Sequence, residues 1–109
     1  MPLKNLPTEA ACSLASLATC RPGQVQSVSF TPVDAPASLM LLAFSAGESV
    51  SEEVYAADTL YYAVEGAARI VVADRAVPLA AGEVLCVPAD VPHAVEAAGP
   101  LKLLQASIP

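Results

Sequence analysis

The stretch GEVLCVPADVPHAV, which runs from Gly82 to Val95, decides how the rest of the chain is interpreted. It contains a short apolar segment, a turn bounded by two prolines, and His93, the single histidine of the protein. Proline fixes φ and offers no backbone donor, so Pro88 and Pro92 predict a tight connection between two strands rather than one continued strand. His93 is therefore expected at the start of the second strand, with its side chain on a defined face.

Outward from this stretch, short apolar or alternating segments follow one another, separated by glycine, proline and aspartate. The pattern predicts strands over residues 25–30, 38–45, 59–65, 68–73, 77–79, 83–87, 93–96 and 101–107. The polar run from Glu48 to Glu53 is expected to be a connection. Short strands at regular turn spacing, without helical segments between them, are typical of an all-β sandwich or barrel.

Two further features complete the expected architecture. The segment Thr8 to Ala18, TEAACSLASLA, has a capping threonine and helical spacing of its leucines, so it predicts one short amphipathic helix within an N-terminal arm, residues 1–22. The barrel is expected over residues 23–109. Its segment 38–45, SLMLLAFS, is apolar on both faces, which requires a barrel interior on one side and another sheet or subunit on the other.

Composition excludes several classes of function. The 109 residues suffice for one domain, and the net charge of −6 leaves only five scattered basic residues. Binding to nucleic acid or to an anionic membrane surface needs clustered basic residues, so neither is expected. No apolar run approaches the roughly 18 residues of a membrane-spanning helix, and the N-terminus lacks the charge-then-apolar order of a secretory signal.

The cysteine spacing indicates the cellular compartment, and the low share of charged residues indicates the oligomeric state. Cys12, Cys20 and Cys86 have neither disulfide-framework nor zinc-type spacing, so we expect free thiols in a reducing cytoplasm. Hydrophobic residues make up 55% of the chain and charged residues 15%, which is apolar for a small soluble protein. Some exposed apolar surface is therefore expected to be covered in a homodimer.

Two stretches carry polar residues and glycines at a spacing that identifies a family. They contain Gly47, Glu53, Tyr55, Thr59 and Gly66 in the first, and Gly82, Pro88, Asp90, His93 and Ala97 in the second. These stretches resemble the two signature motifs of the cupin superfamily, without a single insertion. The resemblance covers the chain from about residue 23 to the C-terminus and implies an all-β cupin jelly-roll barrel of the RmlC-like type.

The resemblance also implies which positions would hold a metal. In metal-dependent cupins, two histidines and a glutamate of the first motif bind a divalent metal together with the histidine of the second. Here Glu53, Tyr55 and Thr59 stand at the first three positions, and only His93 is kept. Because a catalytic metal usually needs three protein ligands, no metal cofactor is expected. An unusual transition-metal site made by Glu53, Tyr55 and His93 is the alternative.

Strand parity within the family's barrel places these side chains, together with Tyr61 and Ala63, on the cavity side. The resemblance therefore implies a ligand pocket formed by Glu53, Tyr55, Thr59, Tyr61 and His93. Two interpretations of His93 stay open. The imidazole is either satisfied by a backbone carbonyl, Glu53 or Tyr55, or it serves as a polar anchor or a general acid or base.

Three functions are consistent with these features. The favoured one is a cupin that binds a small organic molecule in a degenerate, metal-free pocket, because an apolar cavity with a few polar groups is a default ligand site. The second is a dioxygenase-like or isomerase-like cupin enzyme with an unusual metal site or with His93 as its only candidate catalytic residue. The third is a structural dimeric module that acts through outward-facing residues such as Leu60 and Tyr62.

Overall fold

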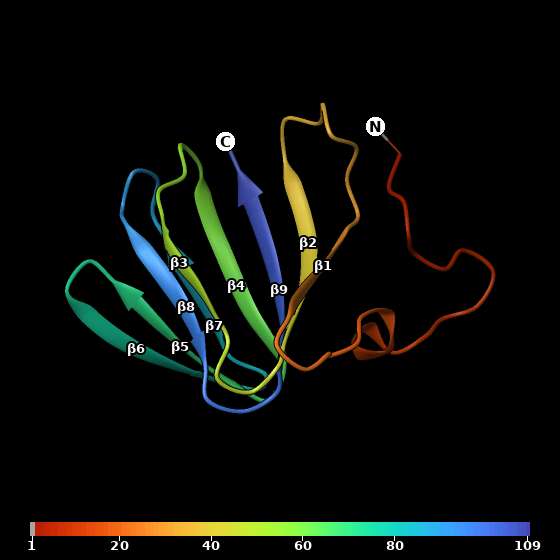
Figure 1. The fold of residues 1–109 in the computed structure, drawn as a ribbon. Helices are drawn as coiled ribbons and strands as arrows, with labels where there is room; N and C mark the ends of the chain where they lie inside the picture. Colours follow the sequence, from red (N-terminus) through yellow and green to blue (C-terminus); the bar gives the residue numbers. More distant parts are fainter. Residues whose placement is uncertain (1) are drawn as a thin grey trace.

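A computed structural model describes residues 2–109 as nine strands and one short 3-10 helix (Figure 1). The elements are η1 (Leu14–Leu17), β1 (Val25–Ser29), β2 (Ser38–Phe44), β3 (Ser49–Glu53), β4 (Asp58–Glu65), β5 (Ala67–Val72), β6 (Arg75–Ala80), β7 (Val84–Val87), β8 (His93–Ala97) and β9 (Leu101–Ile108). All strand pairs are antiparallel. The fold is the predicted all-β jelly-roll barrel.

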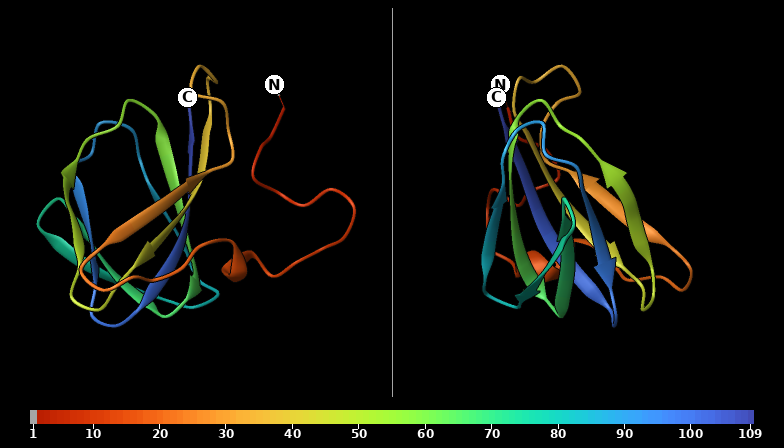
Figure 2. Two further views of the ribbon diagram at one scale, coloured as in Figure 1. Left: turned by 45° about the vertical axis from the view of Figure 1, so that its right-hand side comes forward. Right: turned by 90° about the vertical axis from the view of Figure 1, so that its left-hand side faces the viewer.

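The strands form two sheets that face each other (Figure 2). The five-stranded sheet has the order β1-β2-β9-β4-β7, and the four-stranded sheet has the order β3-β8-β5-β6. Alternate residues of each strand point between the sheets, so Thr59, Tyr61 and Ala63 of β4 are almost completely buried. The predicted inward parity of Tyr61 and Ala63 is confirmed. The central core between the sheets includes Phe44, Ile70, Leu79, Leu101 and Leu103.

One expected connection is a strand. The polar run Glu48 to Glu53 was expected to be a loop, but residues Ser49–Glu53 form β3 and pair with β8. The reason is its place at the edge of the four-stranded sheet, where most of its side chains face solvent and polar residues are tolerated. At the opposite edge, β6 contains Pro78, which is compatible with a strand that has one unpaired side.

The N-terminal helix is shorter than predicted. Instead of a helix over Thr8 to Ala18, the structure has a single 3-10 turn at Leu14–Leu17, and the Ser13 side chain makes no capping hydrogen bond. The segment contains four alanines and two leucines, which favour a helix, but isolated segments of this length are marginal as helices. Contacts with the barrel therefore decide its conformation.

The arm covers part of the outer face of the five-stranded sheet (Figure 2). Leu14, Leu17 and Ala18 pack with Leu41 and Ala43 of β2 in a second apolar cluster. The apolar strand over 38–45 thus has the second cover that its sequence requires, and this chain's own N-terminal segment supplies much of it.

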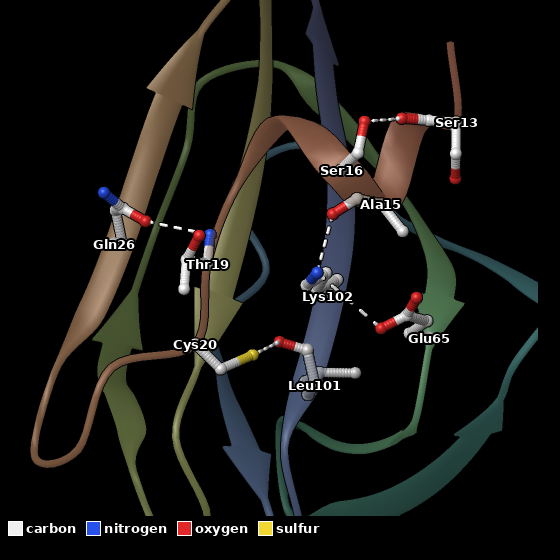
Figure 3. A network of polar contacts seen from close by, with 9 residues as sticks. All are labelled: Ser13, Ala15, Ser16, Thr19, Cys20, Gln26, Glu65, Leu101 and Lys102. Carbon is white, nitrogen blue, oxygen red and sulfur yellow. Dashed lines mark hydrogen bonds and ion pairs between the residues drawn. The ribbon is translucent and has the colours of Figure 1, made fainter.

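A set of polar contacts fastens the arm to the sheet (Figure 3). The Lys102 ammonium of β9 donates a 2.6 Å hydrogen bond to the Ala15 carbonyl and lies 3.7 Å from the Glu65 carboxylate. The Thr19 amide donates to the side-chain oxygen of Gln26 at 3.0 Å.

Within residues 2–109, no helix has the length and apolarity that a membrane span requires.

Candidate ligand pocket

His93 lies at the start of β8 with its imidazole buried between the sheets. Nδ1 lies 3.0 Å from the Val91 carbonyl oxygen, two residues earlier in the turn that Pro88 and Pro92 bound. Nε2 lies 2.7 Å from the hydroxyl oxygen of Tyr61, which belongs to β4 of the other sheet. Both ring nitrogens of the single histidine therefore have a protein partner.

The partners determine where the protons sit. A carbonyl oxygen only accepts, so Nδ1 of His93 donates to Val91. In the neutral imidazole Nε2 carries no proton, so it accepts the hydrogen bond that the Tyr61 hydroxyl donates. Burial raises the pKa of Tyr61 well above its ordinary value, and the neighbouring Tyr55 and Glu53 raise it further. The Tyr61 hydroxyl thus keeps its proton over the physiological range.

A β-bulge brings Glu53 beside His93. Val50 of β3 pairs with Val95 of β8, whereas Glu53 pairs with His93, so β3 contains one residue more than β8 between these pairs. The extra residue turns the end of the strand. As a result Val50 and Glu53, which are three positions apart, both line the same cavity.

Tyr55 is placed by contacts between two loops. Its carbonyl accepts a 2.7 Å hydrogen bond from the Asp90 amide, and the Asp58 carboxylate accepts a 2.8 Å hydrogen bond from the Ala89 amide. Asp90 has a φ of +66°, a conformation that aspartate tolerates better than most residues, and it occupies the glycine position of the second motif. The Tyr55 ring ends with its centroid 5.5 Å from that of His93.

These side chains surround a small cavity between the sheets. Its lining combines apolar residues with five polar or ionisable side chains besides Ser51: Glu53, Tyr55, Tyr61, His93 and Gln105. The cavity volume is about 10 Å³, which is room for roughly one water molecule. The barrel interior is therefore almost filled by side chains, and the half-buried Glu53 and Tyr55 lie where it meets solvent.

Four of the five predicted pocket residues meet at this cavity, and one does not. Thr59 is buried but is absent from the lining, because its hydroxyl is paired with that of Ser107 at 3.0 Å. Gln105 of β9 lines the cavity and was not predicted. The signal was available in the sequence, since Leu101, Leu103 and Gln105 share one face of the last strand and a glutamine at a core position is unusual.

The donor set does not fit a metal of the kind that the family's motif implies. Within the described chain, no three His, Cys, Asp or Glu side chains come together to hold a metal ion. Glu53 is the only carboxylate at the cavity. Nε2 of His93 is occupied by the Tyr61 hydroxyl and Nδ1 by the Val91 carbonyl, so neither nitrogen presents a free lone pair to a cation.

A second hollow lies at the end of the barrel beside the arm. It is a shallow groove of about 380 Å³ lined by Cys20, Pro22, Gly23, Ser45, Ala46 and Pro100. Its polar groups are already engaged, since the Ser45 hydroxyl accepts from the Gly23 amide and the Cys20 thiol lies 3.7 Å from the Leu101 carbonyl. The small cavity at His93 is the better candidate site.

The family model described as a cupin domain matches residues 40–106, more than half of the chain. The chain belongs to the cupin family. A solved cupin superfamily protein from Desulfitobacterium hafniense is 42% identical to this cupin, with a TM-score of 0.95 over 99% of this chain and 98% of the other. The family predicted from the two motifs is thereby confirmed.

More distant structures share the fold. A conserved protein of unknown function from Streptococcus pyogenes is 17% identical, with a TM-score of 0.93 over 99% of this cupin and 94% of that chain. A salicylate 1,2-dioxygenase from Pseudaminobacter salicylatoxidans is 22% identical, with a TM-score of 0.71 over 83% of this cupin and 27% of that chain. At these identities the likeness establishes fold only. No curated protein matches this sequence.

Proposed function

We propose that this cupin binds a small molecule, without a metal, in the cavity between its sheets. The observation that carries the proposal is the pairing of both His93 nitrogens with Val91 and Tyr61. In this state the imidazole is a fixed wall of the cavity and not a free ligand or base. The cavity keeps the mixture of apolar surface and convergent polar groups that is typical of ligand sites.

The dimensions of the cavity restrict the ligand. Drug-sized ligands occupy pockets of roughly 300–1,000 Å³, far more than the space beside His93. The ligand is therefore a molecule of few heavy atoms, or its entry moves the half-buried side chains of Glu53 and Tyr55. These two side chains form the solvent side of the pocket, whereas Tyr61 and His93 form its buried floor.

A metal assay tests the proposal. Protein produced without an affinity tag is analysed for its elements, and its melting temperature is measured with added zinc, manganese and iron salts. We expect far less than one equivalent of any transition metal and no rise in melting temperature, because a metal that binds only the folded state would stabilise it. A content of about one equivalent per chain, lost both in His93→Ala and in the milder Glu53→Gln, would overturn it.

The alternative of a cupin enzyme has less support. Acid or base catalysis by His93 needs a ring nitrogen that can exchange a proton with a substrate, and in this structure Nε2 is engaged by the Tyr61 hydroxyl and Nδ1 by the Val91 carbonyl. A proton that moves from Tyr61 to His93 would leave a buried phenolate, which the raised pKa of Tyr61 disfavours. An activity with a histidine-like pH profile that vanishes in His93→Ala would favour this alternative.

We also propose that the protein forms a homodimer and is located in the cytoplasm. Leu60 and Val84 on the outer face of neighbouring strands β4 and β7 are 40% and 61% exposed, and we propose that a second copy covers them in a homodimer. A monomer in sedimentation at micromolar concentration would contradict this. The three cysteines are unpaired, as in a protein of the reducing cytoplasm.

A further inference from the structure

Gln105 is a buried amide without a protein partner. The residue is only 6% exposed, it lines the cavity, and its side chain makes no hydrogen bond with any residue from 2 to 109. Over the same residues, no fully enclosed side-chain nitrogen or oxygen lacks a partner. The amide of Gln105 therefore faces the open space of the cavity, where an unpaired polar group favours binding of a ligand or a water.

Glu53 and Tyr61 offer the cavity acceptors only. The carboxylate of Glu53 only accepts hydrogen bonds, and like Gln105 it has no hydrogen-bond partner within the described residues. The Tyr61 hydroxyl donates its hydrogen bond to Nε2 of His93, so its oxygen can only accept a hydrogen bond from a ligand. The Gln105 amide and the Tyr55 hydroxyl can each accept as well as donate, so they can also accept from a ligand that carries donors.

The cavity lining carries only negative charge. Glu53 is the only charged residue that lines the cavity, and no lysine or arginine is among the lining residues. An anionic ligand would therefore meet a half-buried carboxylate with no compensating cation, in a chain whose net charge is −6. A cation that carries several donors would pair with Glu53 and with the neighbouring oxygens.

We propose that the pocket recognises a small ammonium cation, either ammonium itself or a primary alkylammonium such as methylammonium, with Glu53 as its counter-ion and Gln105 as the group that orients it. This inference rests on the proposed binding function and adds the chemical class of the ligand. Ammonium is close to water in size, which matches the 10 Å³ cavity. The ring of Tyr55 also lines the cavity, and aromatic rings attract cations.

The test is a titration followed by nuclear magnetic resonance at pH 7 and constant ionic strength. The probes are ammonium chloride and methylammonium chloride. The comparison probes are potassium chloride, a cation of similar size without donors, sodium acetate as an anion, and acetamide as a neutral amide. The signals to follow are the side-chain amide of Gln105 and the ring of His93, and the exposed Gln24 serves as an internal reference.

The expected result is a saturable shift of the Gln105 and His93 signals with ammonium or methylammonium, and a weaker effect of potassium. Glu53→Gln and the similarly sized Gln105→Leu should each weaken binding by about tenfold or more, because the first removes the counter-charge and the second removes the hydrogen-bonding amide. Glu52→Gln is the matched control, since it removes the same charge one residue away at an exposed position outside the cavity.

The contrary results are distinguishable. If acetate or acetamide shifts Gln105 and ammonium does not, or if potassium acts as strongly as ammonium, the inferred ligand class is wrong while the proposed binding function stands. If Glu52→Gln weakens ammonium binding as much as Glu53→Gln, the assignment of the counter-ion is wrong. If no probe shifts either signal, the inferred ligand class is wrong, whereas the proposed function is judged by the metal assay.

Discussion

The hydroxyl oxygen of Tyr61 lies 2.7 Å from Nε2 of His93, although the two residues are 32 positions apart and belong to opposite sheets. This hydrogen bond crosses the barrel interior and joins β4 to β8. The aromatic rings meet edge to face with centroids 5.6 Å apart. One contact thus contributes to the packing of the two sheets, fixes the imidazole and removes its free lone pair.

Removal of the Tyr61 hydroxyl should cost stability. In Tyr61→Phe the buried Nε2 of His93 loses its partner, so we expect the free energy of unfolding to fall by about 1–3 kcal/mol. Urea denaturation measures the difference. Tyr62→Phe is the matched control, because the next side chain points to the outer face, and it should change stability by less than about 0.5 kcal/mol. Equal losses in both variants would contradict this role of the hydrogen bond.

The same residue predicts a pH dependence. The pKa of Tyr61 is raised in the folded state, so the folded protein holds this proton at pH values where the unfolded chain has lost it. The associated stability is fully present below the unfolded pKa of about 10 and is lost as the pH rises above it toward the folded pKa. Urea unfolding at several alkaline pH values should give a steeper loss in the wild type than in Tyr61→Phe. Parallel curves would show that Tyr61 is not responsible.

Gly66 closes the turn between β4 and β5 in a conformation that no other residue fits. Its φ is +79°, and a Cβ atom would lie 2.2 Å from the Pro100 carbonyl oxygen. Gly66→Ala should therefore reduce the free energy of unfolding by more than about 2 kcal/mol. Gly99→Ala is the control, because a Cβ there meets no atom within 4 Å and its φ is not positive. A Gly66 variant as stable as the Gly99 variant would be incompatible with this close approach of the turn to Pro100.

Lys102 should hold the arm on the sheet. Its ammonium bonds the Ala15 carbonyl while its side chain is only 16% exposed. In Lys102→Met we expect amide hydrogen exchange over residues 13–20 to become about tenfold faster or more, because a hydrogen bond from a charged donor is lost. Lys4→Met removes the same charge from an exposed position and should leave the exchange unchanged. Unchanged exchange in Lys102→Met would show that apolar packing alone holds the arm.

The fold could be predicted from the sequence because turns and strands are marked by local features. Glycine, proline and alternation of polar and apolar residues report directly on turns and strands, and the two motif spacings were sufficient to identify the barrel. The prediction failed for β3, since an edge strand with exposed polar side chains resembles a loop in composition. It also overestimated the N-terminal helix, where contacts with Leu41 and Ala43 override the helical preference of the alanines and leucines.

The candidate site was predicted less completely. Motif register correctly brought Glu53, Tyr55, Tyr61 and His93 to one cavity, because strand parity carries over with the fold. The pairing of Tyr61 with His93 depends on how two sheets pack, and the size of the cavity depends on every side chain that fills it. Neither quantity is encoded in a local pattern. The bulge that re-aims Glu53 is likewise a property of the β3–β8 pairing.

The central claim is that His93 is a hydrogen-bonded wall of the pocket and not a metal ligand. Nitrogen-15 resonance of the imidazole tests it directly, since the chain contains one histidine and hence one pair of ring signals. We predict a protonated Nδ1 and an unprotonated, hydrogen-bonded Nε2, both unmoved by equimolar zinc, as in the Val91 and Tyr61 pairing. A zinc-dependent displacement of either signal, absent in Glu53→Gln, would contradict the account.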